Sequence, residues 1–392
     1  MRLRYPYDLS DSEETELVNL RRAINQWWKN FANRSEALVQ LFNKKQKWDL
    51  PAWMNENLSP IYSDLMWEYG QGLLGGHRLV ITPESDRNIR PLVAEILRSA
   101  PAIDGWEFYA FRLPEDAVSA RSMVEARNGE RLDDMRFIFS HGDFNRVDVR
   151  CLVCKDYPVE KSHATGFVAL ESLLGEELLD RWIGYIDHEQ VDEFPSNCIP
   201  AENVLAAARR VVTEIQSKLP SDVWSEHVDE VEWSLCKLKP AQESTDHPKR
   251  RDQFSQVSAY PELHKCALNN VPFDSVRFSN YDETFVYIKI DGSEGLPEWG
   301  FADRGEIEDA LITALGGCNL GTVIGGGTGL KYTYIDLALM DVNKAVPVIR
   351  ETLSRGGVSL RSWILFFDSY LEDEWIGIFS DSPPPPLEMI SE

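Results

Sequence analysis

The chain has 392 residues, of which 43% are hydrophobic and 11% aromatic, and its 64 acidic and 40 basic residues give a net charge of −24 at pH 7. A hydrophobic fraction of this size can fill packed cores and excludes a wholly disordered chain, while the length favours two domains. The acidic balance repels phosphate backbones, so we expect no nucleic-acid binding. It favours a solvated acidic surface that keeps the chain soluble, and docking on a basic protein partner is the alternative.

Neither a membrane segment nor a secretion signal is indicated. No apolar run approaches the length that crosses a bilayer, and the basic residues at the start are not followed by an apolar core. Of six cysteines only Cys151 and Cys154 form a CxxC pair, and on the predicted strand an offset of three places them on opposite faces. We therefore expect buried, reduced cysteines, no metal, no cofactor and a cytoplasmic location.

Residues 1–195 predict an α+β domain in which long aromatic helices pack on a sheet. An amphipathic helix is predicted over residues 14–44, where apolar residues recur at three- and four-residue steps. A second helix is predicted to open at Asp49 and to continue to Tyr69. The later predicted elements are a strand over 77–82, a helix over 91–97, a strand over 106–112, a helix over 117–126, a hairpin of 136–140 with 147–154, and a helix over 167–186.

Residues 196–253 are interpreted as a connecting segment that holds a helix over 202–218, a strand and a polar loop. The loop, residues 240–253, is polar and charged throughout, which predicts an exposed loop or a linker. The basic run Lys249–Arg251 is expected to be solvated, and contact with a phosphate or an acidic partner is the alternative.

Residues 254–380 predict a ferredoxin-like α+β domain. Its six elements follow the order strand, helix, strand, strand, helix, strand, which is the split βαβ arrangement. The predicted strands cover 285–290, 322–324, 332–339 and 362–367, and the helices cover 305–315 and 345–353, the latter capped by Asp341. A short strand over 375–379 and a Pro-rich acidic tail, residues 381–392, follow.

The glycine-rich segment 325–329 lies between two of these strands and predicts a wide hairpin loop. Four glycines in five residues exceed what a tight turn requires, so a backbone nest for an anion or a carboxylate is the alternative. The candidate ligand site comprises Gly325, Gly326, Gly327, Gly329, Lys331, Tyr334 and Asp336.

No catalytic residue is assigned. Ser140, His141 and Asp143 hold nucleophile, base and acid types, but such close neighbours on a turn rarely converge. The acidic runs around His188 and His227 lack the histidine spacing of a metal site.

The block from Glu306 to Trp375 resembles bacterial domains of unknown function of the DUF695 type, in which an acidic helix leads to a glycine-marked hairpin, a Tyr-rich strand, a second helix and a closing Asp…Trp. The same outline is similar to the small acidic protein regulators that inhibit ribonuclease E. The resemblance implies the ferredoxin-like fold and regulation by protein contact, and it brings no catalytic residue. The matching positions are Glu306, Leu311, Leu315, Gly325, Gly327, Tyr332, Tyr334, Leu353, Asp368 and Trp375.

Taken together, these features predict a non-enzymatic protein-interaction or regulatory module. One alternative is a small-molecule-binding protein or enzyme that uses the 325–329 segment. Another is an acidic mimic of nucleic acid that occupies a basic partner. Exposed strands of ferredoxin-like domains often pair, so a homodimer is also expected.

Overall fold

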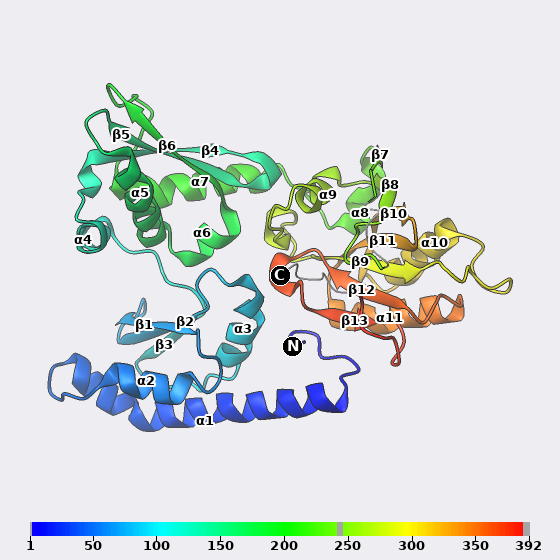
Figure 1. The fold of residues 1–392 in the computed structure, drawn as a ribbon, viewed down its shortest axis with the longest axis horizontal. Helices are drawn as coiled ribbons and strands as arrows, with labels where there is room; N and C mark the ends of the chain where they lie inside the picture. Colours follow the sequence, from blue (N-terminus) through cyan, green and yellow to red (C-terminus); the bar gives the residue numbers. More distant parts are fainter. Residues whose placement is uncertain (1, 241–245, 387–392) are drawn as a thin grey trace. The chain divides into compact units, whose positions relative to one another are not determined.

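The computed structural model describes residues 2–240 and 246–386. The chain divides into two compact units (Figure 1). We call Asp11–Ser217 the N-terminal unit, and Met1–Ser10 together with Lys218–Glu392 the C-terminal unit. Both mix helices with sheet, which confirms the α+β class. No helix in the described ranges is both long and apolar enough to span a membrane.

The N-terminal unit contains two three-stranded sheets, ordered β1-β2-β3 and β4-β5-β6. The strands are β1 (Met66–Gln71), β2 (His77–Thr82), β3 (Trp106–Tyr109), β4 (Met135–His141), β5 (Val147–Cys154) and β6 (Ile183–Val191). The helices are α1 (Asp11–Phe42), α2 (Leu50–Leu58), α3 (Arg90–Arg98), α4 (Ala117–Asn128), α5 (Val159–Leu174), α6 (Glu176–Trp182) and α7 (Val204–Gln216).

The long helix α1 packs its aromatic stripe on the first sheet, as the periodicity predicts. Trp28 and Phe31 are almost fully buried, and their rings contact Phe108 and Trp106 of β3. The indole N–H of Trp28 donates a 2.8 Å hydrogen bond to the carbonyl of Ile96 and so fixes α1 against α3. Burial of such large side chains contributes most of the stabilisation at this contact.

Two predicted helices of this unit are wrong in extent. The helix that opens at Asp49 ends at Leu58, because Pro60 lacks the N–H that another turn requires, and the residues up to Tyr69 enter β1. The helix predicted over 167–186 breaks at Gly175, whose φ of +74° is outside the helical range. A short helix, α6, and the strand β6 follow the break.

The C-terminal unit is built on a seven-stranded antiparallel sheet in the order β13-β12-β9-β11-β10-β8-β7. Its strands are β7 (Ser234–Lys237), β8 (Gln253–Ser258), β9 (Thr284–Asp291), β10 (Gly321–Gly329), β11 (Tyr332–Leu339), β12 (Ser362–Phe366) and β13 (Trp375–Gly377). Its helices are α8 (Trp224–His227), α9 (Pro261–Leu268), α10 (Arg304–Gly316) and α11 (Val342–Arg355). The sheet therefore has more strands than the four of the expected domain.

The main core of this unit lies between one face of the sheet and the helices α10 and α11. Ile288 of β9 and Ile335 of β11 are fully buried there against Leu311 and Ile349. The Asp341 carboxylate accepts a hydrogen bond from the N–H of Lys344 and caps α11 as predicted. The predicted pattern of alternating strands and amphipathic helices is thus present in this part of the chain.

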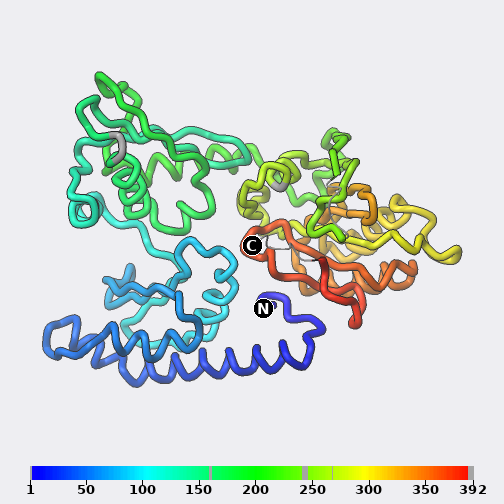
Figure 2. Tube along the Cα trace, in the orientation of Figure 1, coloured from blue at the N-terminus to red at the C-terminus, as the bar shows by residue number. Residues whose placement is uncertain are grey.

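The observed division differs from the connecting segment predicted over 196–253. Helix α7 packs in the core of the N-terminal unit, where Val204 and Ala208 are fully buried, whereas β7 and β8 join the large sheet. The first residues also belong to the C-terminal unit, and their path can be followed along the Cα trace in Figure 2. The N–H groups of Leu3 and Arg4 donate to the Glu374 carboxylate. The boundary between the units depends on which core each apolar side chain joins, and the polarity of a segment does not predict this.

Candidate functional site

The second face of the large sheet carries aromatic and charged side chains in place of the apolar residues that face α10 and α11. Along β9 the apolar residues Val286, Ile288 and Ile290 face α10 and α11, so the intervening Tyr287 and Lys289 face the other way. On the neighbouring strand Tyr332, Tyr334 and Asp336 share this second face, and all three are almost fully buried. We call this surface the polar face.

Residues 246–253 cross the polar face, and we call them the strap. The prediction of an exposed loop or linker is wrong for this segment, since His247 and Asp252 are buried and only a tenth of the Arg250 side chain is exposed. The strap stays in place because its polar groups find partners beneath it, as buried polar groups must. The remaining loop residues 241–245 lie outside the described residues.

At one end of the strap, Arg250 forms a bidentate ion pair with Asp336. On the other side of this carboxylate, Nε2 of His264 in α9 lies 3.1 Å from Oδ2 of Asp336. Burial alone would raise the pKa of Asp336, but Arg250 and His264 lower it to about 2. Burial also lowers the pKa of His264, so the imidazole is neutral and donates to a permanently charged carboxylate.

Two positions after Arg250, the Asp252 carboxylate occupies a set of converging donors. Its Oδ2 accepts hydrogen bonds of 2.9 Å from the backbone N–H groups of both Lys331 and Tyr332. Its Oδ1 accepts from the hydroxyl of Tyr334. Burial and the neighbouring carboxylate raise the pKa of Tyr334, which keeps this hydroxyl protonated and able to donate. These donors lie outside the 325–329 segment, where a nest was the alternative expectation. We call them the carboxylate nest, and the chain itself fills it.

Lys289 is a fully buried amine beneath the strap. Its Nζ donates to the carbonyl of His247 and lies 4.0 Å from the ring centroid of Tyr332. Burial lowers the pKa of Lys289 to about 7 despite the attraction of Asp252 and Asp246. A substantial share of this amine is therefore neutral at physiological pH, when it can act as a base or a nucleophile towards any molecule that reaches it.

The other end of the strap is held by Asp246. Its carboxylate accepts from the Tyr332 hydroxyl and from Arg361, whose Nη2 lies 2.7 Å from Oδ2. Arg361 also pairs with Asp291 at 2.8 Å. Burial would raise the pKa of Asp246, but these donors and Lys331 lower it to about 2. Along the strap, Asp246 and Asp252 thus stand on either side of the basic run Lys249–Arg251.

The glycine-rich segment is not a loop. Gly325, Gly326, Gly327 and Gly329 lie within β10, paired on one side with β11 and on the other with β8. A Cβ on Gly327 would come within 1.7 Å of Nε2 of Gln253, and one on Gly329 within 2.2 Å of the Asp252 carboxylate. Gly327 and Gly329 are therefore explained by the space that strap side chains occupy above the strand, whereas a Cβ on Gly325 would meet Asp336 and one on Gly326 would meet Glu308 of α10.

The structure brings together Lys331, Tyr334 and Asp336 from the predicted site. It adds residues that sequence reasoning missed: Asp246, Arg250, Asp252, His264, Lys289, Tyr332 and Arg361. One signal for them was present, because Lys289 interrupts an otherwise apolar strand. Arg250 gave no such signal, since nothing in a polar run indicates which of its members is buried.

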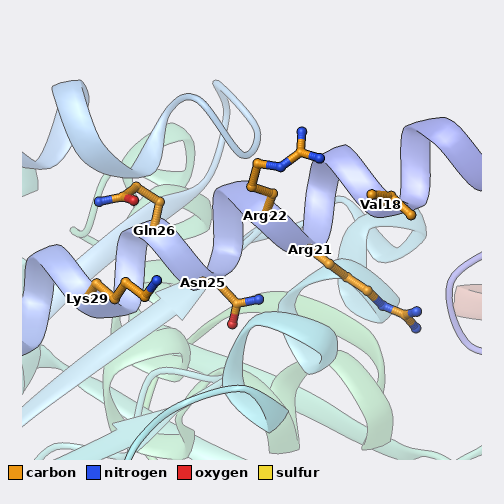
Figure 3. A pocket seen from close by; sticks show the side chains of 6 residues that line it. All are labelled: Val18, Arg21, Arg22, Asn25, Gln26 and Lys29. Carbon is orange, nitrogen blue, oxygen red and sulfur yellow. The ribbon is translucent and has the colours of Figure 1, made fainter.

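A separate hollow lies on α1 of the N-terminal unit (Figure 3), whereas every predicted site residue belongs to the C-terminal unit. Its lining comes from a single helix, and Arg21 there also pairs with Glu95. The lining residues are Val18, Arg21, Arg22, Asn25, Gln26 and Lys29.

Within the described ranges, no three His, Cys, Asp or Glu residues are grouped so that they could hold a metal ion. Cys151 and Cys154 have opposite exposure, as expected for opposite faces of β5, but the expectation of buried cysteines is wrong for Cys154, Cys236 and Cys318, which are exposed. Comparison with known proteins gives no match to a family model, to a curated protein or to a solved structure.

Proposed function

We propose that the chain is a non-enzymatic interaction protein whose acidic surface docks on a basic protein partner. The observation that carries this proposal is the filled nest: the backbone donors of Lys331 and Tyr332, where a ligand carboxylate would bind, already hold Asp252. A net charge of −24 supplies a strong and long-ranged attraction for a basic surface.

In this proposal the polar face has a structural role. Buried charge networks of this kind add little net stability but favour one arrangement of the chain over others, here a single position of the strap. We also propose that β9, α10, β10, β11, α11 and β12 constitute a ferredoxin-like unit, extended by β13 on one side and by β8 and β7 on the other. The order β12-β9-β11-β10 and the helices between these strands support that assignment.

The test begins with capture of proteins on the immobilised chain at low ionic strength, followed by measurement of the affinity of the purified partner. We expect a partner with a basic surface, whose Kd rises at least about tenfold between 50 and 500 mM salt because screening weakens the attraction. Two exposed acid pairs serve as matched variants of equal charge change: Asp229→Asn with Glu232→Gln, and Glu14→Gln with Glu16→Gln. The first pair lies in the C-terminal unit and the second in the N-terminal unit. The pair whose substitution weakens binding more identifies the unit that docks on the partner.

A thermal-denaturation screen against nucleotides, amino acids and metabolites provides the opposing outcome. A small molecule at a hundredfold excess over its Kd would stabilise the chain by about 2.7 kcal/mol. If such a molecule were found, and its effect were lost in Lys331→Ala, the polar face would be a ligand site and the proposal would be wrong.

A further inference from the structure

The strand β7 lies at one end of the large sheet. It pairs antiparallel with β8, with Leu235 opposite Val257, and among the described residues no strand lies beyond it. Large apolar side chains are exposed along it, with Leu235 at 68% and Trp233, which precedes the strand, at 42%. An open strand edge with apolar side chains is a template for pairing with another strand.

The hydrogen-bonding pattern shows which backbone groups point away from the sheet. The N–H of Leu238 donates a 2.8 Å hydrogen bond to the carbonyl of Phe254, so these two residues are a bonded pair of the ladder. Bonded pairs alternate along antiparallel strands, and therefore Cys236 and Ser234 also bond to β8. The N–H and C=O groups of Leu235 and Lys237 point outward, where an added strand would meet them.

We propose that β7 pairs with β7 of a second copy of this chain, antiparallel and with Leu235 opposite Leu235. A two-fold axis between identical antiparallel strands requires one residue to face its own copy, and the outward groups of Leu235 and Lys237 allow the axis to pass at Leu235, Cys236 or Lys237. Centring on Cys236 would place each Leu235 opposite Lys237 of the other copy, which leaves the leucine without an apolar partner. Centring on Lys237 would put two lysines directly opposite each other, which is destabilising.

Centring on Leu235 gives complementary neighbours. The two leucines face each other, and Trp233 of each copy lies opposite Lys237 of the other, an arrangement that suits a cation–π contact. Leu235 shares its face of the sheet with Val257, Gly326 and Ile335, which is the face that bears α10 and α11. The leucine pair therefore continues the apolar face from one copy to the next.

This inference does not depend on the basic partner, and salt distinguishes the two. Each copy carries a charge of −24, so long-range repulsion opposes the dimer and added salt should strengthen it, whereas salt weakens binding to a basic partner. The two proposals can thus fail separately.

The experiment is sedimentation of the full chain over about 1 to 200 µM at low and moderate salt. We expect a reversible dimer, at least about tenfold weaker in Leu235→Asp, because the substitution places two carboxylates opposite each other. The matched control is Leu268→Asp on α9, where the leucine is 58% exposed and lies off the edge. A monomer throughout, or a dimer that Leu235→Asp leaves unchanged, would overturn the proposal.

Disulfide trapping tests the register. Leu235→Cys is made with Cys154, Cys236 and Cys318, the exposed cysteines, replaced by serine. Directly opposed residues of a bonded pair have Cα atoms about 5.5 Å apart, within disulfide reach, so this variant should cross-link under mild oxidation. In the unsubstituted chain the two Cys236 residues are two positions out of register and should not cross-link. Trapping through Cys236 instead would refute the Leu235-centred register.

Discussion

Arg250 of the strap and Asp336 of β11 form a buried ion pair across 86 positions of sequence. The Asp336 side chain has no exposed surface, so its charge depends on Arg250 and on the imidazole of His264. This pair joins a segment with no regular structure of its own to the centre of the sheet.

Removal of Arg250 should therefore be costly. Arg250→Ala leaves a buried carboxylate without its cation, and we expect the free energy of unfolding to fall by about 3 to 5 kcal/mol in urea denaturation. The neighbouring Lys249→Ala is the control, because its pair with Glu372 is exposed and should contribute less than about 1 kcal/mol. The double variant Arg250→Met with Asp336→Leu should recover most of the loss; if it does not, the loss has another cause.

Lys289 should make stability rise towards alkaline pH. Its pKa of about 7 in the folded chain is below its ordinary value of 10.5, so the unfolded chain binds more protons between these two pH values. The penalty of a buried charge is present in full below pH 7 and disappears as the pH approaches 10.5. Between pH 7 and 9 the chain should gain about 2 kcal/mol relative to Lys289→Met, measured by urea denaturation. If the free energy of unfolding changed equally with pH in the unsubstituted chain and in Lys289→Met, the lowered pKa of Lys289 would be wrong.

The glycines of β10 should not tolerate a methyl group. Gly327→Ala places a Cβ against Gln253, and we expect a loss of about 1 to 3 kcal/mol in thermal or urea unfolding. Gln253→Ala should relieve part of this loss when combined with it. Gly316→Ala is the matched control, since a Cβ there meets nothing within 4 Å, and it should be neutral or slightly stabilising. If Gly327→Ala left the free energy of unfolding unchanged, the strap would be able to move off the strand.

A histidine pair in the N-terminal unit should make the chain sensitive to acid. The rings of His163 and His188 stack at 4.1 Å, and burial, together with His163, lowers the pKa of His188. The folded state therefore favours the neutral imidazole of His188. The stability that depends on this neutral form is present in full above the ordinary pKa of 6.5 and is lost as the pH falls below it. We expect His163→Gln to reduce the loss between pH 7 and 5 by returning the pKa of His188 towards 6.5. Proton NMR titration of His188 measures that shift directly.

The fold could be predicted from the sequence where periodicity was long and unbroken. Helix α1 and the order of elements from β9 to β12 follow from patterns of 3.6 and 2 residues, which burial on one face imposes. The end of the second helix could not be predicted in this way. The helical spacing of apolar residues continues past Pro60, whereas the helix cannot, because Pro60 has no backbone N–H.

The candidate site was harder to predict, because its residues act in pairs that are distant in sequence. Glycines between two strands are typical of a turn. Only the positions of Gln253 and Asp252 above β10 show that Gly327 and Gly329 instead leave room for these side chains. The same holds for Arg250, whose burial depends on Asp336. Polarity predicts that a side chain is exposed when it has no hydrogen-bonding partner. Which residues become partners depends on the folded chain, so the sequence alone does not show it.

The hydrogen bonds of Leu3 and Arg4 to Glu374 have a consequence for the order of folding during synthesis. The N-terminal unit is interposed between the first residues and Lys218, so it can fold while the rest of the chain is still being made. Residues 2–10 are translated before this unit, whereas their acceptor Glu374 is translated after it. The C-terminal unit is therefore completed only after Glu374 has been made, when two segments separated by the whole N-terminal unit meet.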